Sequence, residues 1–410
     1  MGNIGIYISN YGVCDVDITN ILSGNPGIGG TQYEMFLLAI LLSKSKKFNT
    51  TIFLDKKQKG LEMGNIICLK EQKEVVSNCN NLGIDILILR AMSCFDFIDN
   101  LSKTKVIYWV HNFIDYKSAV SLSSSKTVYK VVFVSKQHYD LYLDLSVIKK
   151  SDYVFNCVQT IKRNIHQQEK DNIVVFTGNL VPYNKLDVVT KMWPEILKKV
   201  PDAKLYVIGS GQNGNRTIQL GKEGIIADGY ENIVLAPLKK NKCEDSVVFW
   251  GNKGIEKDEI IRQAKVAVAP CKIETFCISA VEYILDNVPV VAIKKAGLID
   301  VVKDKQTGLL CQTYRGMKKT LIALLTNKKK ITITEDAKNY IYENFSYTSF
   351  LSKWTNIIND TLACNKQNQY KASKPLSENL KWAGVIINKL KKIFPLPDKI
   401  SRLGIRSLKK

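Results

Sequence analysis

Histidine is scarce in this chain, and no two cysteines are spaced as C-x-x-C. The 410 residues contain three histidines, far apart in the sequence, and ten cysteines scattered from Cys14 to Cys364. Structural zinc sites place cysteine and histidine ligands at short, regular spacings, so we expect no metal site. Such scattered cysteines in a long chain also argue against a secreted disulfide framework. We therefore expect reduced thiols and a cytoplasmic protein.

Long apolar segments are also missing. No run of about 18 apolar residues occurs, which is the length that a transmembrane helix needs. The chain opens directly on the strand-like residues 4–8, without the basic start and apolar stretch of a signal peptide. We therefore expect neither a transmembrane helix nor a signal peptide.

Acidic residues are fewer than basic residues. Lys and Arg total 59 against 38 Asp and Glu, which gives a formal net charge of +21. This charge favours partners such as nucleic acid, anionic lipid or phosphorylated substrates, without choosing among them. Hydrophobic residues make up 45% of the chain, as in an ordinary globular protein. At about 150 residues per domain, two or three domains are expected.

Short apolar runs alternate with helical patterns along the chain, which predicts an α/β fold built on parallel sheets. The helix after the first strand has apolar residues at Met35, Leu38, Leu41 and Leu42. The expected strands are residues 4–8, 51–54, 84–89, 106–110, 131–134, 153–155, 173–177, 204–208, 247–250, 266–269 and 288–293.

Composition predicts the domain boundaries. The polar stretch from Gln159 to Asn172 reads as a linker between two α/β halves of similar size. We expect a first domain over residues 1–160, a hinge over 161–172 and a second domain over 173–335. Helices are expected over 336–365, and a basic tail over 366–410.

The last forty residues, 371–410, have an unusual composition. They hold eleven Lys and Arg against Glu378 and Asp398, with Trp382 and Phe394 among the lysines. A basic amphipathic helix with aromatic anchors is typical of binding to an anionic membrane surface. The alternative is a solvated tail that docks on its own protein.

Residues 266–293 are the most informative segment and read as strand, loop, helix and strand. Glu274 lies in the loop at the carboxyl end of the strand, where open α/β sheets bind their ligands. Free N–H groups at the start of the following helix suit a phosphate. The residues that supply these amides are Thr275, Phe276, Cys277 and Ile278.

A second carboxylate, Glu282, follows Glu274 after eight residues. Two carboxylates beside an anion repel it, unless each accepts hydrogen bonds from hydroxyl groups on either side of a diphosphate. One carboxylate would then hold a sugar ring and the other a ribose, which is the layout of a nucleotide sugar. The alternative is that Glu274 caps the helix and Glu282 pairs with a surface lysine.

This E-x(7)-E pattern, between a strand that ends in proline and the sequence Pro-Val-Val, resembles the retaining glycosyltransferases of family 4 (glycosyl transferases group 1). The resemblance covers residues 3–362 in outline. It implies the GT-B architecture, in which two Rossmann-like domains face each other across a cleft, here with a C-terminal helical extension. The first domain would be the acceptor side, and the second would bind the donor nucleotide sugar.

Further landmarks occur in the order that this resemblance implies. The segment from Val175 to Lys185 resembles the family's diphosphate-binding loop, with Lys185 at its lysine and Asn179 where arginine is usual. Gly29 and Gly30 resemble the glycine-rich loop that approaches the donor phosphates; they fit the G-x-G-x-x-G fingerprint of dinucleotide sites poorly. His111 matches a histidine that faces the transferred sugar. Residues 201–211, 248–251 and 307–310 resemble other family segments, the last of them a closing turn.

The resemblance implies a metal-independent transfer of a sugar from a UDP- or GDP-sugar to a hydroxyl acceptor, with retention. Glu274 and His111 would be catalytic. The expected acceptor is lipid-linked or a saccharide, in bacterial surface polysaccharide or lipopolysaccharide synthesis, in the cytoplasm or at the inner face of the plasma membrane. The donor-binding residues would be Gly29, Gly30, Asn179, Lys185, Thr275, Phe276, Cys277, Ile278 and Glu282.

Other classes of protein stay open. A non-catalytic nucleotide-sugar binding protein of the same fold would show donor binding without turnover. An inverting GT-B enzyme or a nucleotide-sugar epimerase would differ in the product anomer. A nucleic-acid-binding protein would explain the charge of +21. It would need basic and aromatic residues interleaved on one face, which are not evident, so we expect no nucleic-acid partner.

Overall fold

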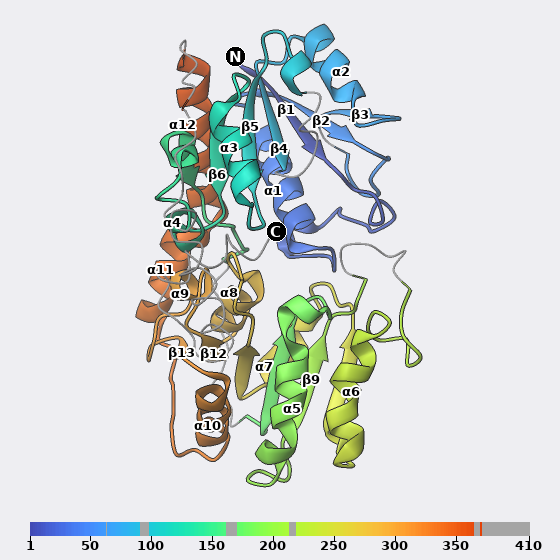
Figure 1. Cartoon of the computed structure of the whole chain (residues 1–410), viewed down its shortest axis with the longest axis vertical. Helices are drawn as coiled ribbons and strands as arrows, with labels where there is room; N and C mark the ends of the chain where they lie inside the picture. The colour runs from blue at the N-terminus through green and yellow to red at the C-terminus, as the bar shows by residue number, and fades with distance from the viewer. Residues whose placement is uncertain (63, 91–97, 161–169, 213–218, 365–369, 371–410) are drawn as a thin grey trace. The chain divides into compact units, whose positions relative to one another are not determined.

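The computed structural model describes residues 1–62, 64–90, 98–160, 170–212, 219–364 and 370. Most of the predicted hinge and, apart from residue 370, all of the predicted tail lie outside the described residues. The chain divides into two compact units (Figure 1). Unit 1 comprises Met1–Cys14, Thr31–Asn156 and the described residues from Tyr347 onward; unit 2 comprises Asp15–Gly30 and Cys157–Ser346.

A seven-stranded parallel sheet forms the centre of unit 1, in the order β3-β2-β1-β4-β5-β6-β7. Three of its inner strands are rich in apolar residues and are buried along nearly their whole length, as expected for a sheet covered on both faces. The strands are β1 Asn3–Ile8, β2 Asn49–Leu54, β3 Asn65–Cys68, β4 Ile86–Arg90, β5 Lys105–Val110, β6 Val128–Phe133 and β7 Ser151–Tyr153.

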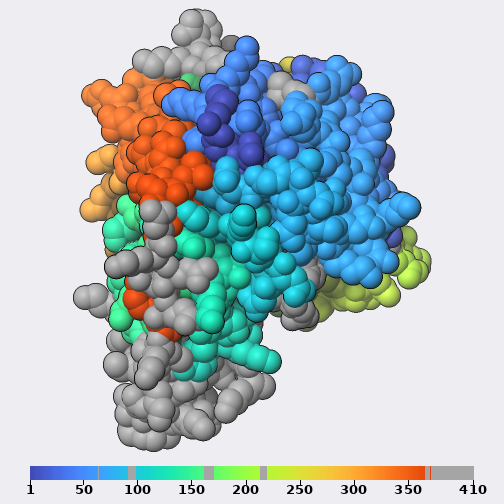
Figure 2. Space-filling view, turned by 90° about the horizontal axis from the view of Figure 1, so that it is seen from above, coloured from blue at the N-terminus to red at the C-terminus, as the bar shows by residue number. Residues whose placement is uncertain are grey.

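The helices of unit 1 include one that follows unit 2 in the sequence. Those encoded between the strands are α1 Gly30–Ser45, α2 Glu74–Leu82, α3 Tyr116–Ser124 and α4 Lys136–Asp140, and the last is α12 Tyr347–Ala363. The Trp354 indole on α12 packs against Trp109 of β5 in a T-shaped arrangement, with ring centroids 4.9 Å apart. In Figure 2 the orange-red residues of α12 lie beside the dark blue N-terminal residues of β1. The C-terminal helix therefore completes the fold of the N-terminal unit.

Unit 2 repeats the same architecture with six parallel strands, in the order β10-β9-β8-β11-β12-β13. Its strands are β8 Ile173–Thr177, β9 Lys204–Ile208, β10 Val247–Gly251, β11 Val266–Ala269, β12 Val290–Ile293 and β13 Gly308–Cys311. Two parallel α/β sheets thus confirm the predicted fold class. The segment 307–310, predicted as a turn, largely forms β13 instead.

Helices follow most strands of unit 2. They are α5 Leu186–Leu197, α6 Tyr230–Lys240, α7 Lys257–Gln263, α8 Ile278–Leu285, α9 Leu298–Val301, α10 Tyr314–Leu325 and α11 Glu335–Phe345. Phe345, at the end of α11, packs against Phe276 with ring centroids 5.0 Å apart. None of the helices in the described part of the chain has both the length and the apolar composition to cross a membrane. The nine described cysteines are free thiols.

Candidate nucleotide-sugar site

The loops after β8 and β11 meet at the point where the strand order of the unit 2 sheet reverses. These two strands pair in parallel, yet the chain continues from β8 to β9 on one side and from β11 to β12 on the other. Open α/β sheets bind their ligands at the carboxyl ends of the strands at such a reversal. Lys185 and Glu274, the two residues that the sequence singles out most clearly, lie on these two loops.

The loop after β8 has a well-defined conformation. Gly178 has a φ of +155°, and the Asn184 side-chain amide donates to the carbonyl of Asn179 at 2.8 Å. Lys185 adopts the left-handed conformation, with φ 64° and ψ 32°, directly before α5. A residue other than glycine in this region is uncommon and carries a cost of about 1–2 kcal/mol, so the loop holds the lysine at a strained position.

Hydrogen bonds join this loop to the one after β11. The Tyr183 hydroxyl donates to the carbonyl of Ile273 at 2.5 Å. In the other direction, the Cys271 thiol donates to the carbonyl of Tyr183 at 3.4 Å. Neither bond was predicted from the sequence. They fix the two loops against each other, so that a cation on one and a carboxylate on the other share one small region.

Glu274 lies in a turn that its own carboxylate stabilises. The carboxylate accepts hydrogen bonds from the amides of Phe276, Thr275 and Cys277, which are three of the amides that the sequence assigns to a phosphate. Burial raises the pKa of Glu274, and these hydrogen bonds partly oppose the rise. A diphosphate that binds these amides must take the place of the carboxylate, which then becomes available to sugar hydroxyls.

The backbone around the turn explains the residues found there. Cys277 has a φ of +79°, a conformation that glycine adopts without strain. The amide of Gly297 donates to the carbonyl of Glu274 at 2.9 Å. A Cβ atom at Gly297 would lie 2.3 Å from the carbonyl oxygen of Thr275, so only glycine fits beneath the turn. The short loop before α9 thus packs against the Glu274 turn and supports it.

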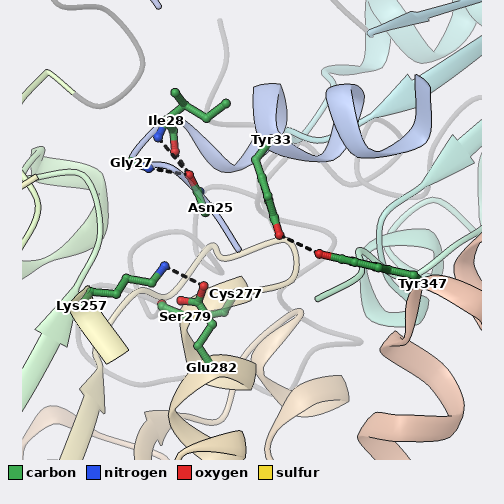
Figure 3. A network of polar contacts seen from close by, with 9 residues as sticks. All are labelled: Asn25, Gly27, Ile28, Tyr33, Lys257, Cys277, Ser279, Glu282 and Tyr347. Atoms are coloured by element: carbon green, nitrogen blue, oxygen red, sulfur yellow. Dashed lines mark hydrogen bonds and ion pairs between the residues drawn. The ribbon is translucent and has the colours of Figure 1, made fainter. Parts of the chain in front are cut away.

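Glu282, on α8, is paired with a buried lysine. Its carboxylate lies 2.6 Å from the ammonium of Lys257, and the two side chains are 16% and 8% exposed (Figure 3). Burial raises the pKa of Glu282, whereas the charge and hydrogen bond of Lys257 lower it. The predicted alternative of a pairing with a surface lysine is therefore only half met, because this lysine is in the interior.

Sequence reasoning did not identify Lys257. It is the first residue of α7, twenty-five positions before Glu282, so no local spacing connects the two. One weak signal exists: a helix N-terminus favours acidic residues over basic ones, and Lys257 is a lysine among Glu256, Asp258 and Glu259. A lysine in that place needs a local reason, and the buried carboxylate supplies it.

The glycine-rich loop before α1 packs in unit 2. The side-chain oxygen of Asn25 accepts from the amides of Gly27 and Ile28, both at 2.9 Å (Figure 3). A Cβ atom at Gly27 would lie 3.4 Å from the carbonyl oxygen of Lys253, in the loop before α7. Gly30, which follows Gly29, is similarly close to Ile278: a Cβ there would lie 3.2 Å from its Cδ1. The loop thus reaches the start of α8.

His111 follows β5 in unit 1 and is 5% exposed. Its ring lies against Trp109, with centroids 4.3 Å apart. Burial lowers the pKa of His111 well below its ordinary value, and the positive charge of Arg90 lowers it further. The imidazole is therefore neutral at pH 7 and is suited to hydrogen bonding rather than to charge stabilisation.

No group of three or more His, Cys, Asp or Glu side chains is arranged to hold a metal ion in the described part of the chain.

Comparisons with known proteins agree on the class. Residues 158–344 match the family described as "Glycosyl transferases group 1". The chain is 22% identical over 255 residues to the N-acetyl-alpha-D-glucosaminyl L-malate synthase of Bacillus anthracis, covering 62% of this chain and 61% of that protein. The chain thus spans less than two thirds of this curated relative.

Solved structures resemble this chain over a longer stretch. A glycosyltransferase from Rickettsia africae has a TM-score of 0.67 at 14% identity, covering 89% of this chain and 99% of that one. Anabaena Alr3699/HepE, in complex with UDP and glucose, has a TM-score of 0.64 at 12% identity, covering 88% and 100%. At such identities the likeness concerns the fold alone. This chain thus has the GT-B fold, and its residues 158–344 are similar to the glycosyl transferases group 1 family.

Proposed function

We propose that this chain transfers a sugar from a nucleoside-diphosphate sugar to a hydroxyl acceptor, with retention of the anomeric configuration. The observation that carries the proposal is the meeting of the Lys185 and Glu274 loops where the unit 2 sheet reverses its strand order. A cation suits the diphosphate, as do the amides that the Glu274 carboxylate would release to it, and the released carboxylate suits the hydroxyls of a sugar.

Each residue then has a role in the departure of the diphosphate. Lys185, with the amides of residues 275–278 and of Gly30, would stabilise the negative charge that develops on the leaving group. Glu274 would orient the sugar, and Glu282 would accept hydrogen bonds from the ribose. Because Lys185 and the amides meet this charge, we propose that no metal ion is needed. Activity should therefore survive EDTA.

His111 is assigned to the transferred sugar on the resemblance alone. Its neutral ring can donate one hydrogen bond and accept another. Gly29 and Asn179 are assigned to donor binding in the same way. Asn179 carries no charge, so it replaces only the hydrogen bonds of the usual arginine.

For the donor we propose UDP or GDP as the nucleotide. Anabaena Alr3699/HepE, a structural neighbour, is solved with UDP and glucose, which supports UDP first. For the acceptor we propose a lipid-linked or saccharide hydroxyl in bacterial surface polysaccharide or lipopolysaccharide synthesis. The net charge of +21 fits an enzyme in the cytoplasm that works at the anionic inner face of the plasma membrane.

Thermal unfolding with a panel of nucleotides tests the donor site. UDP, GDP, ADP and the corresponding nucleotide sugars are each added to the full chain. We expect one nucleoside diphosphate and its sugars to raise the melting temperature, and Lys185→Ala to abolish the rise. If none of them stabilises the wild-type protein, the proposal fails.

Product analysis tests the chemistry. With the stabilising donor and a panel of saccharide and lipid-linked acceptors, NMR of the product should show the anomeric configuration of the donor. The opposite anomer would contradict retention. Donor binding with neither transfer nor hydrolysis would instead favour a nucleotide-sugar binding protein.

A further inference from the structure

The proposed diphosphate site has one assigned cation, although its ligand carries more than one negative charge. Lys185 is that cation, and Asn179, on the same loop, is neutral. A second positive charge is expected close by, from outside the β8–α5 loop. The structure offers Lys272, which lies in the loop after β11, two residues before Glu274.

The hydrogen bonds described above bring Lys272 toward Lys185. The flanking residues Cys271 and Ile273 both bond to Tyr183, which lies two residues before Lys185. Lys272 is thus held between two contacts to the loop that carries Lys185. These reciprocal bonds keep the two loops in register.

An aromatic ring orients the Lys272 side chain. Its ammonium lies 4.5 Å from the ring centroid of Tyr314, a distance typical of a cation–π contact. The Tyr314 hydroxyl donates to the carbonyl of Pro270 at 3.1 Å, which ties the ring to the same loop. A cation on an aromatic platform keeps its charge available to an anion, whereas a salt bridge to a carboxylate would neutralise it.

The electrostatics of the two lysines are unfavourable without an anion. Burial lowers the pKa of Lys272, and the positive charge of Lys185 lowers it further. Among the described residues, no carboxylate lies within ion-pairing distance of either ammonium. Two partly buried cations that repel each other are stabilised by an anion that contacts both.

We propose that Lys272 is the second cation of the donor site and binds the diphosphate together with Lys185. This inference rests on the proposed function and assigns a binding residue to it. The contact between Lys272 and the diphosphate would persist after the sugar has been transferred. Lys272 should therefore contribute to the affinity for the nucleoside diphosphate as well as for the nucleotide sugar.

Isothermal titration calorimetry on the full chain tests the inference. The titrants are the nucleoside diphosphate that stabilises the wild-type protein and the monophosphate of the same base. Hydrogen bonds to charged groups are worth about 1.5–3 kcal/mol, so Lys272→Met should weaken diphosphate binding about tenfold to a hundredfold. The monophosphate should lose much less, whereas a distorted loop would weaken both.

Two further variants separate charge from structure. Lys272→Arg should keep the affinity within a few-fold, and Asn179→Arg should recover most of the affinity lost in Lys272→Met. Lys303→Met is the matched control, because Lys303 also lies over a tyrosine ring, 3.6 Å from the centroid of Tyr340 on α11. It should leave binding unchanged.

The titrations distinguish a failure of the proposed function from a failure of this inference alone. If the wild-type protein binds no nucleoside diphosphate, the proposed function fails, and this inference fails with it. If the wild-type protein binds one and Lys272→Met binds it equally well, Lys272 is not a donor ligand and the proposed function stands. An equal loss of monophosphate and diphosphate affinity would also overturn the inference.

Discussion

The two units have the same strand order but different chemistry at the ends of their strands. In each, six strands follow the doubly wound order 3-2-1-4-5-6, and unit 1 adds β7 at one edge. In unit 2 the loops at the reversal carry Lys185, Lys272 and Glu274. In unit 1 the described end of β5 carries Trp109 and a neutral His111.

This difference separates what topology determines from what the loops determine. Topology sets where a ligand can bind, because the carboxyl ends of the strands form the crevice. The loops set which ligand binds. Unit 2 is suited to a polyanion, and the described end of β5 in unit 1 is suited to a neutral group such as a sugar. Changes at four positions test this division, from the largest expected effect to the smallest.

Removing the charge of the central carboxylate should have the largest effect. Glu274→Gln keeps the shape of the side chain and removes a group that we assign to the transition state. Such groups contribute about a hundredfold to a thousandfold to the rate, so kcat/KM for sugar transfer should fall by that factor. Affinity for the free nucleoside diphosphate, measured by calorimetry, should not fall, because the neutral side chain competes less strongly than the carboxylate for the amides after residue 274. A wild-type rate would remove Glu274 from the mechanism.

Breaking the buried ion pair should cost stability and donor affinity. Lys257→Met leaves the Glu282 carboxylate buried without its cation, which costs about 3–5 kcal/mol in comparable pairs. Lys338→Met is the control, because Lys338 is equally buried but pairs with an exposed Glu335. Denaturant unfolding should show a much smaller loss in the control.

The same variant predicts a pH effect. Burial already raises the pKa of Glu282 and Lys257 opposes the rise, so removing Lys257 raises this pKa further. Donor affinity that depends on the ionised carboxylate should therefore begin to fall at a higher pH in Lys257→Met as the solution is acidified. In Lys257→Met/Glu282→Leu, stability should recover without donor affinity. Recovery of both would show that the pair is only structural.

Disturbing the support of the Glu274 turn should have an intermediate effect. In Gly297→Ala the new Cβ would meet the backbone of Thr275, so the turn must move. Displacing a catalytic group by about 1 Å can cost a hundredfold, and we expect a tenfold to hundredfold loss of transfer with an unchanged circular dichroism spectrum. Gly316→Ala, where the Cβ meets only the Thr313 hydroxyl at 3.3 Å, should stay active.

Changing the neutral histidine of unit 1 should have the smallest effect. His111→Gln keeps one donor and one acceptor, so transfer should slow by about tenfold or less, with diphosphate affinity unchanged. Because burial lowers the pKa of His111, the wild-type rate should show no ionisation of this residue above about pH 6.5. A histidine ionisation near neutral pH that disappears in the variant would contradict this environment.

Most of the fold follows from local patterns. Residues 173–177, 204–208 and 266–269 are strands with the bounds expected from their apolar, β-branched runs. Two strands were missed. β3 has only four residues, none of them fully buried, and β13 begins at Gly308, where the sequence favours a turn. A Cβ there would lie 2.1 Å from the Val290 carbonyl oxygen, so tertiary packing selects the glycine.

The site was predictable where it is local and unpredictable where it is assembled. Glu274, the amides after it and Lys185 lie within short motifs, so their spacing could be interpreted directly. Lys257, Lys272 and Gly297 depend on contacts between separate loops, and neither composition nor spacing connects them. The packing of Asp15–Gly30 in unit 2 is of the same kind, because it joins residues more than 200 positions apart.

The position of α12 has a consequence for the order in which the two units fold during synthesis. Unit 1 combines N-terminal residues with residues that follow unit 2 in the sequence. Trp354 packs on Trp109, and the Lys105 ammonium donates to the carbonyls of Thr361, Leu362 and Cys364. Domains usually fold in the order in which the ribosome releases them. We therefore expect unit 2, whose residues end at Ser346, to be complete before the N-terminal sheet can pack against α12.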